Sequence, residues 1–157
     1  MSASPDAAIL AIIQRDWHRP TVNDWVDVLA RLPLFAGVAR RRLRKIAELA
    51  EFREYEPHSV IVQTGDAPDG FYVVLAGRAK RTGSKSGLLG PGDYLGEMAL
   101  LDGGVRSATI VAVTELQTMR LPRVPFIDLL EREPQIAIGM LGGLAGRVRG
   151  LEQARVA

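Results

Sequence analysis

Residues 52–97 read FREYEPHSVIVQTGDAPDGFYVVLAGRAKRTGSKSGLLGPGDYLGE. Short runs of β-branched and aromatic residues alternate here with turns that carry glycine or proline, with a turn about every eight to twelve residues. This spacing predicts antiparallel strands in a β-sandwich or barrel, because βαβ units would need helix-length segments between the strands. A further strand pair is expected at 107–113 and 116–121, since only Thr114 and Glu115 separate these segments.

Helices are expected on both sides of these strands. Three segments before residue 51 repeat apolar residues at helical spacing. These apolar positions are Ile9, Ile12, Ile13 and Trp17, then Trp25, Val28, Leu29 and Leu32, then Leu43, Ile46, Ala47 and Ala50. Thr21 is the expected cap of the second helix. We therefore expect an N-terminal helical extension at 1–32, and a mainly β domain at 33–157 that closes with helices within 123–155.

The composition excludes several classes of protein. The chain has 157 residues, 20 basic and 18 acidic groups, a net charge of +2 and no cysteine. Disulfides and cysteine ligands for a metal are therefore excluded. No apolar run approaches the ~20 residues that span a bilayer, and the N-terminus lacks the basic region of a secretory signal. The cytoplasm is the expected location. The Arg40–Lys45 cluster is either a patch for phosphate or a partner, or a solvated helix face.

The stretch GEMALLDGGVRSAT, residues 96–109, predicts a ligand-binding loop. Gly96 permits backbone torsions or a close approach that a Cβ would forbid. The residues after it favour a short helix, whose first N–H groups attract an anion. Arg106 can donate two hydrogen bonds to phosphate oxygens. The carboxylate of Glu97 only accepts hydrogen bonds, so beside an anion site it suits a sugar hydroxyl.

A sugar hydroxyl and a phosphate together describe a nucleotide. The chain has no GxxxxGK[ST] motif, and this stretch has no acidic cluster for magnesium, so a triphosphate is not expected. One arginine and one helix end suit a cyclic monophosphate. The alternative is that Glu97 and Arg106 pair with each other across the turn and bind no ligand.

Four motifs, in order, resemble those of the cyclic-nucleotide-binding domain family. LPLF resembles the turn before the first strand, and GDAPDGFYVVLAGRAK resembles a characteristic strand–turn–strand stretch. GPGDYLGE resembles the glycine-rich lead into the phosphate-binding cassette, and GEMALL, DGGV and RSAT resemble the cassette itself. The resemblance covers about residues 30–152. It implies a mainly β fold, an eight-stranded jelly-roll-like β-barrel with N-terminal helices and C-terminal lid helices.

The resemblance also implies roles for the site residues. Glu97 would bind the ribose 2′-hydroxyl and Arg106 the cyclic phosphate, while Ser107 would also contact the phosphate. Threonine at the position of Ser107 tends to accompany cGMP preference in the family, so we predict that cAMP is preferred and cGMP is less favoured. The residues expected to bind the nucleotide are Gly96, Glu97, Met98, Ala99, Arg106, Ser107 and Ala108.

The family's last helix folds over the base as a lid, and it corresponds here to residues 135–154. Leu141, Leu144 and Arg147 are candidates for capping the base. Glycines stand at 139, 142, 143, 146 and 150, and each costs ~1 kcal/mol against alanine inside a helix. They indicate a lid that bends, helices that approach closely in a dimer, or a poorly stable terminal helix.

No other residues suggest chemistry. Trp17 and Trp25 are expected in the core, and His18 and His58 at surface or turn positions without metal partners. No nucleophile or catalytic base pair is recognisable, so we expect no enzyme and no metal site. We expect a stand-alone cAMP sensor that moves its flanking helices and acts through a protein partner or a homodimer of the terminal helices. Neither DNA binding nor membrane insertion is expected. The alternatives are a nucleotide-independent interaction module and a regulatory domain of a larger cAMP-controlled protein.

Overall fold

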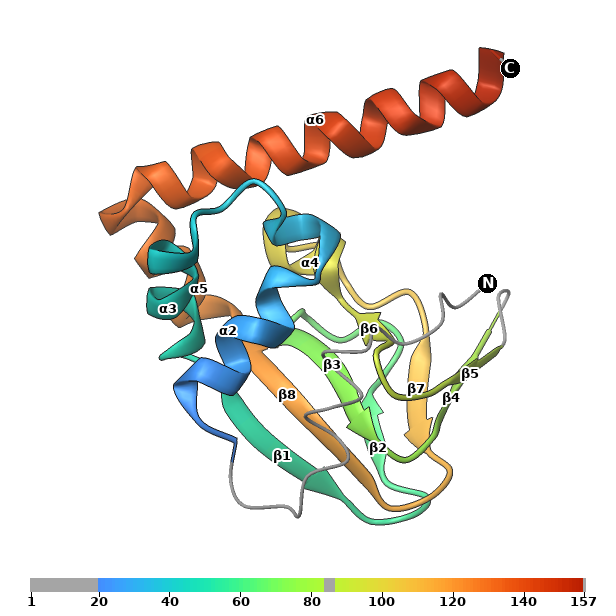
Figure 1. Cartoon of the computed structure of the whole chain (residues 1–157). Coiled ribbons are helices and arrows are strands. Elements are labelled where there is room, and N and C mark those ends of the chain that lie inside the picture. Colours follow the sequence, from blue (N-terminus) through green and yellow to red (C-terminus); the bar gives the residue numbers. More distant parts are fainter. Residues whose placement is uncertain (1–19, 84–86, 157) are drawn as a thin grey trace.

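The computed structural model describes residues 20–83 and 87–156, apart from the side chains of residues 97–99 and 154–156. The first expected helix, with Trp17 and His18, lies outside the described residues. Figure 1 shows a β domain with helices packed on one side and a long terminal helix crossing above them.

Within the described residues, eight strands form two antiparallel sheets. The strands are β1 (Glu51–Tyr55), β2 (Val60–Val62), β3 (Gly70–Ala76), β4 (Ala79–Thr82), β5 (Gly87–Leu89), β6 (Tyr94–Leu95), β7 (Thr109–Ala112) and β8 (Leu116–Pro122). The first sheet has the order β1-β8-β3-β6 and the second the order β2-β7-β4-β5. The mainly β, jelly-roll-like fold is confirmed. The sheets do not close into the predicted barrel, because the edge strands β2, β5 and β6 have only three, three and two residues.

Strands β7 and β8 follow each other in the chain but lie in different sheets. β7 pairs with β2 and β4, whereas β8 pairs with β1 and β3. The prediction that these two strands pair with each other is therefore wrong. Their connection is residues 113–115, and Glu115 lies against Gly77, where an added Cβ would be 2.0 Å from the Glu115 carbonyl oxygen. This close packing holds the connection against the turn that follows β3.

Strand β3 is buried on both faces, which explains its continuous apolar sequence. Phe71, Val73 and Leu75 pack into a core shared with the helices. Tyr72 and Val74 point the other way, into a smaller core between the two sheets. Because successive side chains of a strand point to opposite faces, β3 contributes side chains to both cores.

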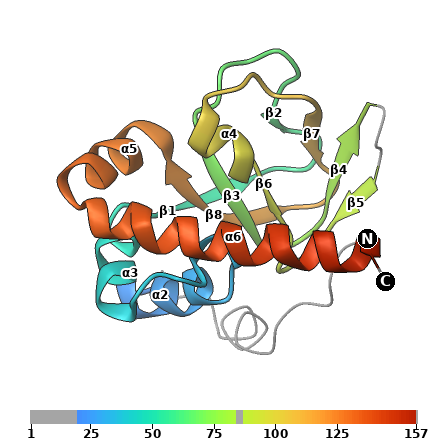
Figure 2. The same ribbon diagram turned by 90° about the horizontal axis from the view of Figure 1, so that it is seen from above.

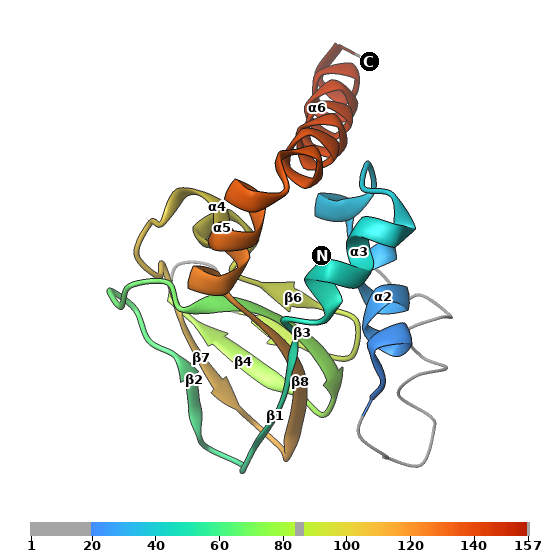
Figure 3. The ribbon, with the colours of Figure 1, turned by 90° about the vertical axis from the view of Figure 1, so that its left-hand side faces the viewer.

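The helices of the described residues cover one side of the first sheet (Figure 3). They are α2 (Val22–Ala30), the 3₁₀ turn η1 (Pro33–Phe35), α3 (Arg40–Ala47), α4 (Glu97–Asp102), α5 (Arg123–Arg132) and α6 (Pro134–Val156). Thr21 caps α2, as predicted, and its cap is a capping box with Asp24. Trp25 is buried in the shared core, also as predicted. His58 lies in a turn with φ 71°, so its expected turn position is confirmed.

The Arg40–Lys45 cluster forms α3 and is partly used within the molecule. Arg40 pairs with Asp27, and Lys45 pairs with Glu133 at the end of α5. Arg44 donates a hydrogen bond of 2.9 Å to Asn23. Three of these basic side chains therefore connect α3 to its neighbouring helices.

Helix α6 runs across the other helices (Figure 2), and it contacts η1 and the turn after it at two glycines. An added Cβ on Gly139 would lie 2.6 Å from the Gly37 carbonyl oxygen, and one on Gly143 would lie 3.1 Å from the Pro33 carbonyl oxygen. Cβ atoms on Gly142, Gly146 and Gly150 would meet nothing within 4 Å. Two of the five glycines thus permit a close approach inside the molecule. The C-terminal half of α6 projects beyond the other helices (Figures 1 and 3).

Candidate functional site

A pocket of about 440 Å³ opens between the second sheet and the loop after α4. Its volume falls within the ~300–1,000 Å³ of typical small-molecule sites. It is lined by Val62, Arg81, Tyr94, Leu95, Gly96, Asp102, Gly104, Val105, Arg106, Ser107, Ala108 and Ile110. Four of the seven predicted site residues, Gly96, Arg106, Ser107 and Ala108, lie in this lining. The other three form the first turn of α4, and their side chains lie outside the described part of the structure.

Arg106 is the most constrained residue of the pocket. Its backbone N–H donates to the Asp66 carbonyl at 2.9 Å, and its carbonyl accepts from the Gly65 N–H at 2.9 Å. Its Nη2 donates to Asp69 Oδ1 at 2.9 Å and to the Gly70 carbonyl oxygen at 2.6 Å. The turn between β2 and β3 therefore fixes both the backbone and the guanidinium.

The Arg106 side chain keeps a donor for a ligand. Only 5% of the side chain is exposed, yet its Nε has no hydrogen-bond partner among the described residues. A buried donor without a partner costs about 1–3 kcal/mol, so an acceptor placed at this atom would be stabilised. A phosphate oxygen fits this requirement, because an ionised acceptor makes the stronger charge-assisted hydrogen bond.

Gly96 makes room for this guanidinium. An added Cβ would lie 2.3 Å from Arg106 Nη1 and 3.0 Å from the Gly70 carbonyl oxygen. The φ of Gly96 is 85°, a torsion that side-chain-bearing residues rarely adopt. Gly96 thus adopts a backbone torsion that requires glycine, as predicted. The group that packs closely against it is the Arg106 guanidinium.

Asp69 joins Arg106 to a polar network on the first sheet. Its Oδ2 accepts from the Tyr72 hydroxyl at 2.9 Å and from Arg120 Nη2 at 3.4 Å. Arg120 also donates to Glu51 Oε2 at 2.9 Å. The network runs from the pocket across β3 and β8 to the edge strand β1.

These contacts shift the pKa values in the network. Partial burial raises the pKa of Asp69, but the hydrogen bonds from Arg106 and Tyr72 and the charge of Arg120 outweigh it, so this pKa lies below its ordinary value. Burial raises the pKa of Tyr72 well above its ordinary value. Asp69 is therefore the ionised partner that holds Arg106 at neutral pH.

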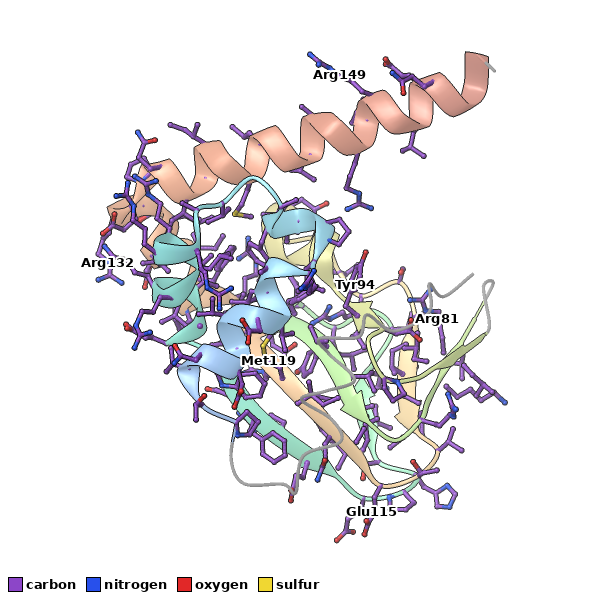
Figure 4. All side chains as sticks on the ribbon, viewed as in Figure 1. Arg81, Tyr94, Glu115, Met119, Arg132 and Arg149 are labelled. Atoms are coloured by element: carbon purple, nitrogen blue, oxygen red, sulfur yellow. The ribbon has the colours of Figure 1, made fainter. Side chains whose placement is uncertain are left out.

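The sequence reasoning missed Asp69 and Arg81. Asp69 and Arg106 stand 37 positions apart in the sequence, so no local pattern indicated their contact. Arg81 stands in a short strand beside other basic residues, so its sequence position gave no reason to place it in the pocket. Side chains of β4 alternate between the two faces of the sheet, so Arg81 lies on the same face as buried Ala79. This alternation could have indicated that Arg81 faces inward. Figure 4 labels Arg81 and Tyr94 on this side of the domain.

Comparison with known proteins gives consistent matches. The model of the cyclic nucleotide-binding domain family matches residues 52–133. The cyclic AMP receptor protein of Thermus thermophilus is 34% identical over 124 residues, which are 74% of this chain and 57% of that protein. A cAMP-dependent protein kinase regulatory subunit of Aspergillus niger is 37% identical over 108 residues, 65% of this chain and 26% of that protein. The chain therefore spans well under two thirds of these curated relatives.

Solved structures agree on the fold. The Thermus thermophilus catabolite activator protein has 32% identity and a TM-score of 0.59, with 78% of this chain and 61% of that chain covered. The regulatory subunit of a cAMP-independent protein kinase A from Trypanosoma brucei has 26% identity and a TM-score of 0.57, with 73% and 46% covered. Among the described residues, no helix combines the length and apolar character that crossing a membrane requires. The pocket, its buried arginine and these matches lead to one conclusion: the chain belongs to the cyclic-nucleotide-binding domain family.

Proposed function

We propose that this chain is a sensor that binds cAMP in the pocket around Arg106. The observation that carries this proposal is the buried Arg106 guanidinium, held by Asp69 and Gly70, with Nε unpartnered among the described residues. This nitrogen and Nη1 would donate to the cyclic phosphate. No metal is needed, because one guanidinium and neighbouring N–H groups offset the single charge of a cyclic phosphate.

The remaining contacts follow the family resemblance. Glu97 would accept the ribose 2′-hydroxyl, and the backbone N–H groups of Gly96, Met98 and Ala99 would surround the phosphate. Ser107, exposed at the mouth of the pocket and next to Ala108, would donate its hydroxyl to the phosphate. Serine in place of threonine favours cAMP over cGMP, and the relatives named for cAMP support the same preference.

The output of binding would be a movement of α5 and α6. Within the described residues, the pocket lining contains no residue of α6, so the capping role of Leu141, Leu144 or Arg147 requires this helix to move. Ligand can shift α6 only if the two arrangements bind it with different affinity. The projecting part of α6 carries exposed Val148 and Leu151, which would contact a second copy or a protein partner in the cytoplasm.

Calorimetric titration with cAMP and cGMP tests the proposal. The parent should bind cAMP more tightly than cGMP. Arg106→Ala should weaken cAMP binding by roughly 2–5 kcal/mol, about 30- to several-thousand-fold, since it removes half of a buried charge pair. Lys80→Ala is the matched control, because Lys80 is exposed on the outward face of β4. If Arg106→Ala binds like the parent, the assignment of the phosphate site is wrong.

A nucleotide-independent interaction module is the second candidate. The match to a kinase regulatory subunit described as cAMP-independent favours it. In that case neither nucleotide would release heat or raise the melting temperature of the parent. The same titration therefore separates the two candidates, and a gel shift with random DNA tests the exposed part of the Arg40–Lys45 cluster.

A further inference from the structure

Arg123 is the first residue of α5, and its side chain has no polar partner. Its backbone N–H donates to the Asp69 carbonyl oxygen at 2.9 Å, so the turn that holds Arg106 also holds the start of α5. The side chain is half-buried and its Nε is buried, yet it makes no hydrogen bond or ion pair among the described residues. A buried donor without an acceptor is energetically unfavourable.

Helix α5 itself does not explain an arginine at this position. A cation at the N-terminus of a helix is disfavoured by the helix dipole, and the first turn of α5 has no acidic residue that offsets it. The reason for Arg123 therefore lies in what its guanidinium faces outside its own helix.

The Arg123 guanidinium lies against Gly103, in the loop that follows α4. An added Cβ on Gly103 would be 3.1 Å from Arg123 Nη2. The φ of Gly103 is 73°, which glycine adopts readily. The next residues of this loop, Gly104, Val105 and Arg106, line the pocket. The side chain of Arg123 thus reaches from the start of α5 to the loop that forms the pocket.

Asp102 precedes Gly103 in the chain and carries a carboxylate into the pocket lining. Its Oδ1 accepts from the Gly104 N–H at 2.8 Å, and Gly104 also lines the pocket. The carboxylate therefore occupies a donor of the pocket and adds a negative charge beside it. Asp102 and Arg123 are not joined by an ion pair in the described structure, although both flank Gly103.

A phosphate bound at Arg106, as proposed above, would bring a second negative charge near Asp102. Repulsion between like charges is strongest where water is excluded. Arg123 offers the carboxylate a cation on the other side of Gly103. A charge-assisted hydrogen bond to this cation would also relieve an arginine that has no polar partner.

We propose that Asp102 and Arg123 are positioning residues for the nucleotide. When the nucleotide binds, the Asp102 carboxylate leaves the Gly104 N–H and pairs with the Arg123 guanidinium. The Gly104 N–H then becomes available to the ligand, and the new ion pair joins the end of α4 to the start of α5. The inference rests on the proposed function, and it supplies a contact through which the ligand changes the position of α5.

A double-mutant cycle with Asp102→Asn and Arg123→Gln, measured by calorimetric titration with cAMP, tests the inference. Arg123→Gln should weaken cAMP binding by about 3- to 15-fold, because only the bound state contains the ion pair. In the Asp102→Asn background, Arg123→Gln should change the affinity by less than about twofold. Without nucleotide, the effects of the two substitutions on the melting temperature should add, because the free protein lacks the pair.

Two further variants separate the charge of Arg123 from its packing. Arg123→Lys keeps the charge, so its affinity for cAMP should stay within about threefold of the parent. Arg132→Gln is the matched control, since it removes the same charge from an exposed position at the other end of α5. It should leave the affinity unchanged, and the melting temperatures would show that each variant is folded.

Four results would overturn the inference. They are an equal loss from Arg123→Gln in both backgrounds, no loss in either, a loss in Arg123→Lys as large as in Arg123→Gln, and coupling of the melting temperatures without nucleotide. A parent protein that binds neither cAMP nor cGMP would instead overturn the proposed function.

Discussion

At the scale of single residues, Asp69 determines how Arg106 is presented. Arg106 is almost fully buried, and Asp69 is the acid that pairs with it in the described part of the chain. Asp69 also accepts from Tyr72 and Arg120, so one half-exposed carboxylate orients three side chains. The site therefore depends on a residue that is not itself in the pocket lining.

Asp69→Asn should destabilise the fold in a pH-dependent way. The pKa of Asp69 is lower in the folded protein than its ordinary value, about 4 in an unfolded chain. Its ionised form therefore stabilises the fold above about pH 4, and this contribution is lost as the pH falls toward the folded pKa. Urea denaturation should show a gap between parent and variant at pH 7 that narrows below pH 4.

Asp66→Asn is the matched control for this pH series. Asp66 lies three residues earlier and contacts Arg106 through its backbone carbonyl, which the substitution keeps. Its unfolding free energy should follow that of the parent across the pH range. A gap for Asp69→Asn that stays constant from pH 7 to pH 3 would contradict the ionised role of Asp69.

At the scale of elements, the glycines of α6 have different surroundings, because only some of them lie at the contact with η1. Gly139 faces Gly37 so closely that a side chain has no room, whereas Gly142 faces open space. The backbones approach each other directly, so the start of α6 is held against η1. Further along the helix, Gly146 and Gly150 also face open space.

Alanine at these two positions should have opposite effects. Gly142→Ala should raise the free energy of unfolding by roughly 0.5–1 kcal/mol, because alanine is the better helix former. Gly139→Ala should lower it by about 1–3 kcal/mol, because its Cβ would lie 2.6 Å from the Gly37 carbonyl oxygen and force the helices apart. Guanidinium denaturation measures both values. Equal stabilisation by the two variants would show that α6 does not dock on η1.

At the scale of the whole molecule, sequence patterns predicted the eight strands and their flanking helices, because periodicity and turns are local signals. They did not predict that β7 and β8 lie in different sheets, since a two-residue connection is also compatible with a hairpin. The Asp69–Arg106 pair was also missed, because no local pattern joins residues 37 positions apart. The inward direction of Arg81 became clear only when its register with buried Ile110 was known.

The exposed face of α6 is the remaining feature at this scale. Ile138, Leu141, Val148 and Leu151 are 53–68% exposed and recur at intervals of three and seven residues, which is the spacing of a coiled-coil seam. We expect two copies of the chain to pair along this face. Sedimentation should give twice the mass of one chain for the parent.

A double variant, Val148→Asp with Leu151→Asp, should sediment as a monomer, because two buried carboxylates per chain would oppose pairing. Arg149→Asp is the control, since Arg149 points away from the domain in Figure 4 and lies beside the apolar row. It should leave the mass doubled. Calorimetry on the double variant should still detect cAMP, since in the described structure no α6 residue lines the pocket. A monomeric parent would contradict the expected pairing along this face.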